Sequence, residues 1–415
     1  MRAGRRHFLA LAGAALAAPL VRAAELMPLT KKRVVVVGGG FAGAIAAKTL
    51  RMANAEVEVV LVERNRIYSA LPGANWVLGG HRRVGENRLA YDRLESLHGV
   101  RMLYGEVQAI DPGERRLALA AGTLAYDHLI VAPGISLRPE EIEGYGADAQ
   151  AACPHAWTSG DEVAALRKQL EEMRDGGLVL MSLPLPPFRC PQAAYERASQ
   201  IAWYLKRSKP RSKLIVLDAS PAPTQMGELF MARWSRDYKT LLEYRGGQKA
   251  LKVDAQRRLW TPAEALRGDV VNLIPPQAAG ELAQKAGLVG DDKRWCPVDH
   301  TTYESAQVPG IHVIGDACAG DDMQRSASAA NAQGKACALN LAAVIARRKP
   351  QPHTYSNVCY SLLNEREGAA SLVFYRGDGD LSRLDKGGGT SPGWSEIEGV
   401  YARAWVGGIL DEMSS

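Results

Sequence analysis

Apolar runs of strand length recur along the chain and alternate with segments whose apolar residues are spaced as in a helix. The strand-like runs are residues 33–37, 57–62, 126–134, 178–181 and 213–218. Valine-rich runs that are apolar throughout are typical of parallel strands covered on both faces. Residues 161–174 and 195–206 carry helical patterns, the first with Val163, Leu166 and Leu170 on one side. The alternation predicts an α/β protein with parallel sheets.

The first strand runs directly into a turn with the pattern G-x-G-x-x-G. Gly38 allows a tight turn, Gly40 lets a backbone N–H approach a pyrophosphate, and Gly43 lets the next helix pack closely on the strand. The second strand ends at Glu63, twenty residues after Gly43, where a carboxylate accepts hydrogen bonds from an adenosine ribose. The glycine pattern alone is weak evidence. With both strands, the helix from residue 44 and the acid, it predicts a dinucleotide-binding fold.

Two later strands end in residues that suit the same cofactor. One ends in Ala132-Pro133-Gly134 and returns the chain to the dinucleotide, and the other ends in Gly315 and Asp316. An aspartate at this position typically bonds the ribityl chain of FAD, and the helix that follows would point its N-terminus at the flavin ring. The alternative is an aspartate that only caps that helix.

A second βαβ unit begins at residue 178 but lacks the glycine pattern that NAD(P)H-dependent flavin enzymes carry there. Prolines take its place, at Pro184, Pro186, Pro187 and Pro191. Because proline has no N–H and fixes φ, this turn is poorly suited to cradling a pyrophosphate. The sequence therefore predicts a degenerate second Rossmann-like domain and no nicotinamide cofactor.

Composition narrows the class of protein further. The 415 residues are 47% hydrophobic and 23% charged, as in a globular chain long enough for two or three domains. The formal net charge is +6, yet no basic run is present, so nucleic-acid binding has no support. The six cysteines include no C-x-x-C, which leaves no pattern for a zinc cluster or an attached haem.

The first residues have the pattern of an export signal. Arg5 and Arg6 precede an apolar stretch at 9–21 that is too short to span a bilayer. This is the twin-arginine pattern of proteins exported already folded around a cofactor. An ordinary secretory signal is the alternative, and both place the mature protein in the periplasm. No other stretch reaches the length of a transmembrane helix.

The chain is expected to divide into a signal peptide and three domains. These are a twin-arginine signal peptide at 1–24, an FAD-binding domain at 30–150 and 268–350, a degenerate Rossmann-like domain at 151–267, and a C-terminal interface domain at 351–415. The two Rossmann-like domains are predicted to be three-layer α/β structures and the last a small α+β domain. Residues 386–392 are predicted to form a glycine-rich loop.

Several motifs together resemble those of one protein family. They lie at residues 34–43, 126–134, 187–191, 195–199, 272–277, 295–299, 310–318 and 357–361. The most specific is Phe188-Arg189-Cys190-Pro191 with the Tyr-Glu-Arg-Ala-Ser helix after it, because this is not a general Rossmann feature. Over nearly all of the mature chain, the sequence resembles the flavoprotein subunit of flavocytochrome c sulfide dehydrogenase. That family is related to sulfide:quinone oxidoreductases within the glutathione-reductase-like flavoproteins.

The resemblance implies a redox disulfide beside the flavin, formed by Cys190 and Cys359. Hydrosulfide can open such a disulfide, leaving a persulfide and a thiolate that passes two electrons to flavin. The alternatives are a structural disulfide or two buried thiols, and spacing alone cannot choose the pairing. Glu196 is a candidate proton acceptor, with a solvated helix-face glutamate as its alternative. The other cysteines are interpreted as packing residues, namely Cys153, Cys296, Cys318 and Cys337.

One departure from the family concerns how the flavin is held. Several members attach FAD through a cysteine in the tyrosine-rich loop, where this chain has Ala70 or Leu71, and no cysteine occurs between residues 1 and 152. FAD is therefore expected to bind without a covalent link, with a lower flavin potential.

The resemblance as a whole implies an FAD-dependent periplasmic sulfide dehydrogenase that oxidises sulfide to sulfur or polysulfide. Electrons would pass to a c-type cytochrome subunit in a heterodimer. Two alternatives stay open: a sulfide:quinone oxidoreductase, and a non-catalytic flavin-binding partner of sulfur-oxidation proteins.

Overall fold

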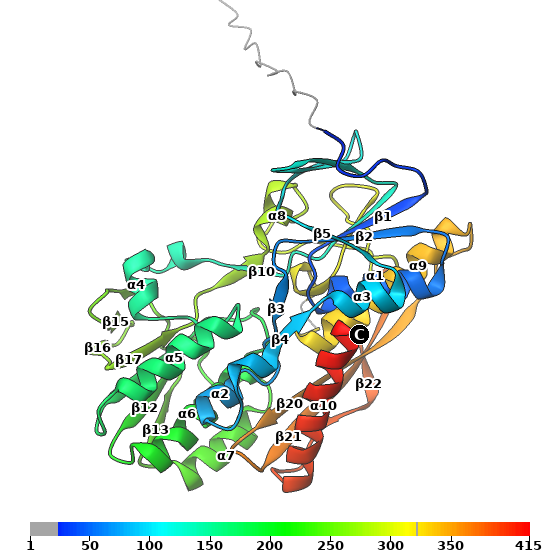
Figure 1. The fold of residues 1–415 in the computed structure, drawn as a ribbon. Coiled ribbons are helices and arrows are strands. Elements are labelled where there is room, and N and C mark those ends of the chain that lie inside the picture. The colour runs from blue at the N-terminus through cyan, green and yellow to red at the C-terminus, as the bar shows by residue number, and fades with distance from the viewer. Residues whose placement is uncertain (1–23, 321–322) are drawn as a thin grey trace, which may run out of the picture.

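The computed structural model describes residues 24–320 and 323–415. The predicted signal peptide at 1–24 therefore lies, except for its last residue, outside the described residues. The described chain forms two α/β domains and a C-terminal sheet with a long helix (Figure 1). The predicted fold class is confirmed.

The first domain is built on a parallel sheet in the order β19-β9-β1-β2-β5. Its strands are β1 (Arg33–Val37), β2 (Glu58–Glu63), β5 (Arg101–Tyr104), β9 (His128–Val131) and β19 (Ile311–Val313). Helices α1 (Phe41–Ala53), α3 (Asp92–His98) and α9 (Ala327–Ile345) form one layer beside it (Figure 1). The third layer is the antiparallel meander of β6 (Val107–Asp111), β7 (Arg116–Leu119) and β8 (Gly122–Ala125), whose apolar residues join the same core.

Helices α1 and α9 pack closely because small residues line their contact. A Cβ on Gly334 of α9 would lie 2.4 Å from the carbonyl oxygen of Ala42 on α1. This contact places the N-termini of both helices on the same side of the sheet, at the carboxyl ends of its strands.

The second domain is also built on a parallel sheet, in the order β13-β12-β11-β17. Its strands are β11 (Leu178–Leu183), β12 (Lys213–Asp218), β13 (Leu242–Arg245) and β17 (Val270–Leu273). Its other elements are α4 (Ala147–Ala152), α5 (Gly160–Glu172), α6 (Pro191–Ser208), α7 (Gly227–Asp237), β14 (Lys252–Val253), β15 (Arg258–Trp260) and β16 (Ala265–Arg267). Because β17 pairs with β11, this sheet continues beyond the boundary at 267 expected from the sequence.

Three segments cross between the two domains. Two are β10 (Ile135–Leu137) and β18 (Gln277–Ala279), which pair with each other in antiparallel fashion. The third is an excursion over residues 67–90, with β3 (Ile67–Ser69), α2 (Asn75–Gly79), η1 (Val84–Asn87) and β4 (Arg88–Ala90). Its helix α2 packs on α5 and α6, so the first domain supplies part of the wall of the second. Short helices η2 (Pro139–Glu141), α8 (Glu281–Lys285) and η3 (Gly315–Ala317) complete these domains.

The C-terminal domain is an antiparallel sheet covered by one helix. Strands β20 (His353–Leu362), β21 (Gly368–Asp378) and β22 (Asp380–Thr390) lie in that order, and α10 (Glu396–Ser414) packs on them (Figure 1). The predicted glycine-rich loop at 386–392 is wrong for its first five residues, which belong to β22. The pairing of β22 shifts register opposite Leu372 and Phe374, and Gly387 takes a positive φ of 92° there. Glycine at this irregularity bends the strand without ending it.

None of the helices in the described ranges is long and apolar enough to cross a membrane.

Candidate functional site

The glycine turn after β1 has the geometry that a bound pyrophosphate requires. Gly38 has a φ of +97°, and a Cβ on it would lie 2.3 Å from the carbonyl oxygen of Ala132. A Cβ on Gly43 would lie 1.9 Å from the carbonyl oxygen of Gly38, so helix and strand meet without side chains there. At Gly40 the nearest neighbouring atom is the Tyr68 hydroxyl, at 3.6 Å. The first N–H groups of α1, which has no side-chain cap, therefore face open space suited to an anion.

Glu63 fixes this turn by accepting hydrogen bonds from main-chain N–H groups. Its Oε2 accepts a hydrogen bond from the N–H of Gly39 at 2.7 Å, and its Oε1 accepts one from the N–H of Asn65 at 2.9 Å. The buried hydroxyl of Tyr91 donates to the carbonyl of Gly39 at 3.0 Å. In this structure Glu63 thus fixes the turn, and its bond to a ribose stays a prediction.

A cleft opens where the glycine turn, the start of α9, the start of α6 and β20 meet. It holds about 160 Å³ of space for water-sized molecules and opens to solvent. Nine of the predicted site residues line it, namely Gly40, Gly43, Ala132, Gly134, Cys190, Glu196, Gly315, Asp316 and Cys359. Gly38 and Glu63 do not line it, because they shape the turn from its far side.

Asp316 does not cap the helix after it, and its role as a ligand residue stays a prediction. Its Oδ2 accepts from Nε of Arg189 at 2.7 Å, whereas its buried Oδ1 has no hydrogen-bond partner among the described residues. Helix α9 is instead capped by Ser326, whose Oγ accepts from the N–H of Ala329 at 3.1 Å. The indole N–H of Trp157, also on the cleft wall, is buried without a partner too. Buried polar atoms rarely lack partners, so this wall fits a cofactor rich in hydroxyl and carbonyl groups, as FAD is.

The structure brings the two predicted redox cysteines together from different domains. Cys190 precedes α6 with a φ of +46°, and its N–H donates to the carbonyl of Arg325 at 2.9 Å. Cys359 lies on β20 and is buried. Both are free thiols in this structure, both line the same cleft, and each shifts the pKa of the other, so the two side chains lie close together. Their pairing as a disulfide stays a prediction.

The environment makes Cys359 the more acidic thiol of the pair. The neighbouring Cys190 thiol lowers the pKa of Cys359 despite its burial, and the polar Ser326 hydroxyl lowers it further. The same thiol contact, together with burial, raises the pKa of Cys190. Asn357 completes the group: its Oδ1 accepts from Oγ of Ser326 at 2.7 Å and lies 3.7 Å from Sγ of Cys359. These opposite shifts favour Cys359 over Cys190 as the site of a single negative charge in this dithiol.

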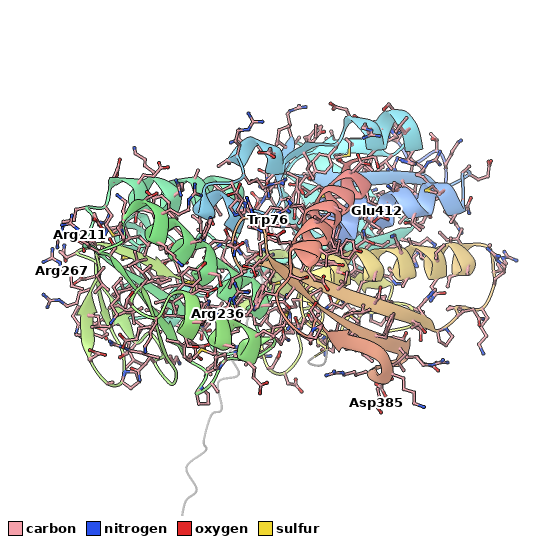
Figure 2. The ribbon with its side chains drawn as sticks, turned by 90° about the horizontal axis from the view of Figure 1, so that it is seen from below. Trp76, Arg211, Arg236, Arg267, Asp385 and Glu412 are labelled. Carbon is pink, nitrogen blue, oxygen red and sulfur yellow. The ribbon has the colours of Figure 1, made fainter. Side chains whose placement is uncertain are left out.

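Glu196 is not the solvated helix-face residue that was its alternative. It is only 6% exposed, and it accepts hydrogen bonds from Nδ2 of Asn75 at 2.8 Å, Nε1 of Trp76 at 2.9 Å and the N–H of Leu362 at 2.8 Å. Burial raises its pKa, although these three donors oppose the rise. Figure 2 shows Trp76 at the junction between the two large domains, which is where this carboxylate lies. Its position in the cleft is compatible with proton transfer near the thiols.

Arg197 is a site residue that the sequence did not single out. It is buried in the cleft wall, donates to Oδ1 of Asn75 at 3.0 Å and to the carbonyl of Ala156 at 2.5 Å, and lies over the ring of Trp157 at 4.6 Å. Burial lowers its pKa to about 9. Glu162 and then the adjacent Glu196 supply compensating charges. Its position next to Glu196 in the Tyr-Glu-Arg-Ala-Ser motif was the only available signal.

The other cysteines do not reach the cleft. They are buried in the domain cores, at Cys153, Cys296, Cys318 and Cys337. Of Ala70 and Leu71, the two residues that the resemblance aligns with the linking cysteine of family members, Leu71 lines the cleft. In residues 24–320 and 323–415 no group of His, Cys, Asp and Glu side chains could hold a metal ion.

Comparisons with known families identify three segments of the chain. Residues 32–173 match the family model described as pyridine nucleotide-disulphide oxidoreductase. Residues 163–275 match the central part of the sulfide dehydrogenase [flavocytochrome c] flavoprotein chain. Residues 351–413 match the flavin-binding part of flavocytochrome c sulphide dehydrogenase.

Individual proteins agree with these matches. The chain is 50% identical over 46 residues to the sulfide dehydrogenase [flavocytochrome c] flavoprotein chain of Chlorobaculum thiosulfatiphilum, covering 11% of this chain and 96% of that sequence. It is 23% identical over 184 residues to the sulfide-quinone reductase of Aquifex aeolicus (strain VF5), covering 44% of this chain and 41% of the length of that relative. The solved sulfide:quinone oxidoreductase of Aquifex aeolicus shares the fold, with a TM-score of 0.77 at 15% identity over 92% of this chain and 91% of that one.

Proposed function

We propose a function from one premise: this chain belongs to the family of flavocytochrome c sulfide dehydrogenase flavoprotein chains. The family places it among oxidoreductases that use FAD. Our proposal is that the protein oxidises sulfide to sulfur or polysulfide through a disulfide of Cys190 and Cys359. The observation that supports it best is the contact of these two thiols in the same cleft as the glycine turn and Asp316.

The proposed chemistry begins with the disulfide closed. Hydrosulfide attacks the sulfur of Cys190, which is more exposed than Cys359, and the S–S bond breaks. Cys190 then carries a persulfide, and Cys359 leaves as the thiolate that its lowered pKa favours. A second hydrosulfide removes the outer sulfur of the persulfide as disulfane anion, and Cys190 is left as a thiol or thiolate.

Re-forming the disulfide completes the cycle. The dithiol loses two electrons, and FAD, when bound by the glycine turn and Asp316, supplies the acceptor for both. The net change is two hydrosulfide ions to one disulfane anion, one proton and two electrons. Glu196 is the carboxylate proposed to take up the proton, since it lies in the same cleft wall.

The central test is an anaerobic titration with sulfide of the purified flavoprotein, followed by flavin absorbance. We expect rapid bleaching in the parent protein and none in Cys190→Ser. Cys153→Ala is the matched control, because this buried cysteine lies in the core of the second domain and should leave bleaching unchanged. No bleaching in the parent would instead favour the non-catalytic flavin-binding role.

A c-type cytochrome is the proposed electron acceptor, in a heterodimer with this chain. The name of the family supports this choice. A quinone is the second candidate, because the chain also matches a sulfide-quinone reductase. Sulfide-dependent reduction of a soluble c-type cytochrome, compared with that of a short-chain quinone, separates the two acceptors. Preferential reduction of the quinone would overturn the cytochrome assignment.

The proposed location is the periplasm, reached through the twin-arginine signal that the sequence predicts. Substituting both Arg5 and Arg6 with lysine should hold the precursor in the cytoplasm, which cell fractionation would detect. Export that is unaffected by this change but blocked by loss of the apolar stretch at 9–21 would indicate the ordinary secretory route.

A further inference from the structure

One stripe of helix α6 is polar and yet completely covered by protein. Gln192, Glu196 and Gln200 follow at four-residue intervals and therefore share a face of the helix. Their exposed fractions are 1%, 6% and 0%. A polar stripe on a helix normally faces water, so this one must find all its partners inside the molecule.

The partners of the stripe lie on β20 at its C-terminal end. Glu196 accepts from the N–H of Leu362 at 2.8 Å, and Nε2 of Gln200 donates to the carbonyl of the same residue at 2.9 Å. Gln192 lies one helical turn before Glu196, and its Nε2 donates to the carbonyl of Cys359 at 3.0 Å. Three successive turns of this helix of the second domain therefore hydrogen-bond to the main chain of the C-terminal strand, at Cys359 and Leu362.

Gln192 is the member of the stripe that bonds the main chain of Cys359. Besides the carbonyl of Cys359, its Nε2 also donates to Oγ of Ser361 at 2.9 Å, and its Oε1 accepts from Oγ of Ser371 at 2.9 Å. The side chain therefore has a fixed orientation. Gln192 lies two residues after Cys190 in the chain, and its side-chain amide bonds the main chain of Cys359. It therefore connects the backbone next to one cysteine with the backbone of the other.

We propose that Gln192 is a positioning residue for the redox pair. It fixes the main chain of Cys359 relative to the start of α6, so that the two sulfurs stay within reach when the bond between them is open. The inference rests on the proposed function, in which that bond opens and re-forms in every turnover. Holding two groups in reacting geometry raises their effective concentration, and this favours the closed disulfide.

The effective concentration can be measured without any activity assay. The full-length holoprotein is equilibrated with glutathione buffers, where two glutathione thiols and the protein disulfide exchange with glutathione disulfide and the protein dithiol. Alkylation in denaturant followed by peptide mapping then reports Cys190 and Cys359 separately from the other four cysteines. We expect Gln192→Met to lower the effective concentration about tenfold, which corresponds to a disulfide potential about 30 mV less negative.

Gln200→Met is the matched control, because it removes the same kind of side chain from the far end of the stripe. Both variants should lose thermal stability, whereas only Gln192→Met should change the potential. A potential that is unchanged in Gln192→Met, or changed equally in both variants, would show that Gln192 has only a structural role. If Gln192→Met does not fold, Ser371→Ala removes the hydroxyl that orients the amide and should shift the potential less, in the same direction; an unshifted potential there would count against the proposal.

The same titration tells this inference from the function on which it rests. If Cys190 and Cys359 of the parent protein remain thiols under oxidising buffers, both the redox disulfide and the positioning role are wrong. If the parent disulfide forms and only the variant fails to respond, the positioning role alone is overturned.

Discussion

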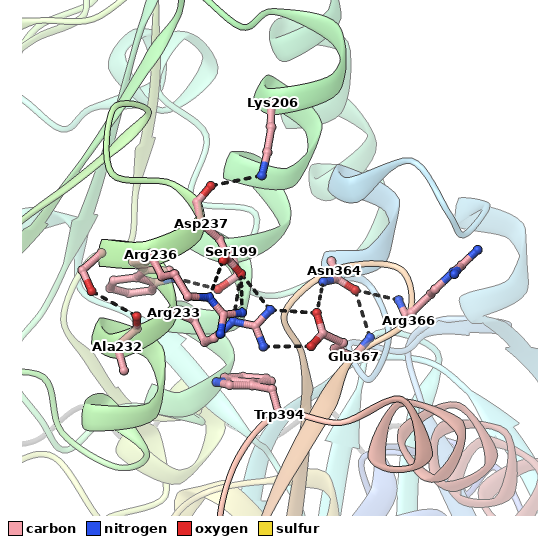
Figure 3. A network of polar contacts seen from close by, with 12 residues as sticks. Ser199, Lys206, Ala232, Arg233, Arg236, Asp237, Asn364, Arg366, Glu367 and Trp394 are labelled. Carbon is pink, nitrogen blue, oxygen red and sulfur yellow. Dashed lines mark hydrogen bonds and ion pairs between the residues drawn. The ribbon is translucent and has the colours of Figure 1, made fainter.

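Arg233 and Glu367 join the second domain to the C-terminal domain through a two-pronged ion pair. Nη1 of Arg233 lies 2.8 Å from Oε1 of Glu367, and Nη2 lies 2.7 Å from Oε2 (Figure 3). Nε of the same arginine donates to Oδ2 of Asp237 at 2.8 Å, and Asn364 donates to Glu367 at 2.8 Å. The network ties α7 to the turn between β20 and β21, and β20 carries Cys359.

Breaking this ion pair should loosen the C-terminal domain. The arginine and glutamate side chains are 11% and 28% exposed, so solvent screens the pair only in part. Two-pronged charged hydrogen bonds of this kind contribute about 1.5–3 kcal/mol, and we expect the lower end here. Arg233→Met, Glu367→Gln and the double variant form a cycle that chemical denaturation can measure. A coupling free energy near zero would show that packing, such as that of Trp394 on Phe230, holds the junction without the charges.

Glu162 should make the stability of the second domain fall at low pH. Burial alone would raise its pKa, but hydrogen bonds from His155 and Thr158 prevail and lower it from the usual 4.5 to about 2. A carboxyl whose pKa is lower in the folded state stabilises that state above its unfolded pKa and loses this contribution as pH falls through the folded one.

The window for this loss is therefore pH 4.5 down to about 2. Glu162→Gln should cost about 1.5–3 kcal/mol at neutral pH, the range for hydrogen bonds to charged groups. The difference in free energy of unfolding between variant and parent should shrink as pH falls through the window. A difference that does not depend on pH would assign the effect to lost capping of α5 alone.

Two glycines in the phosphate-binding turn should respond differently to alanine. A Cβ on Gly43 collides with the carbonyl of Gly38, so Gly43→Ala should destabilise the apoprotein itself. A Cβ on Gly40 has 3.6 Å to its nearest neighbour, and this residue already has a φ of −73°, which alanine adopts readily. Gly40→Ala should leave the melting temperature of the apoprotein nearly unchanged while weakening FAD binding by tenfold or more, about 1.4 kcal/mol. Equal retention of FAD by Gly40→Ala and parent would contradict the pyrophosphate assignment.

Ser326 should tune the acidity of Cys359. Its hydroxyl helps lower the pKa of that thiol, so Ser326→Ala should raise this pKa in the reduced protein. The measurement is the pH dependence of alkylation of Cys359 by a small reagent, mapped by peptide.

The matched control for this change is Ser395→Ala. Ser395 caps α10 as Ser326 caps α9, with Oγ accepting from the N–H of Glu398 at 3.2 Å. Each variant should lose about 1 kcal/mol of stability through its cap, and only Ser326→Ala should shift the alkylation profile. Equal profiles in the two variants would show that the hydroxyl has no electrostatic role.

Local signals in the sequence predicted the first domain well. The valine runs and the glycine turn specify β1, β2 and the start of α1 because parallel strands and tight turns restrict residue types locally. The prolines before Cys190 likewise led to the prediction of a degenerate second Rossmann-like domain. What the sequence could not show is that Asp218, at the end of β12, has its carboxylate bonded by Tyr195 and Tyr244, at 2.9 and 3.0 Å.

The polar walls of the cleft were harder to predict, because their partners are distant in sequence. Glu196 is bonded by residues about 120 and 166 positions away, so the sequence could not exclude a solvated helix-face position for it. Arg197 looked like an ordinary charged residue for the same reason. The glycines at 387–389 suggested a loop, since strand pairing of β22 depends on β21 and not on local propensity.

The three segments that cross between the large domains have a consequence for substrate choice. Because the two domains are connected at β10, at β18 and at residues 67–90, they resist the hinged closure by which many enzymes enclose a substrate. Selection among ligands would then depend on the fixed shape of the cleft between the domains, and not on closure around a molecule that has already bound.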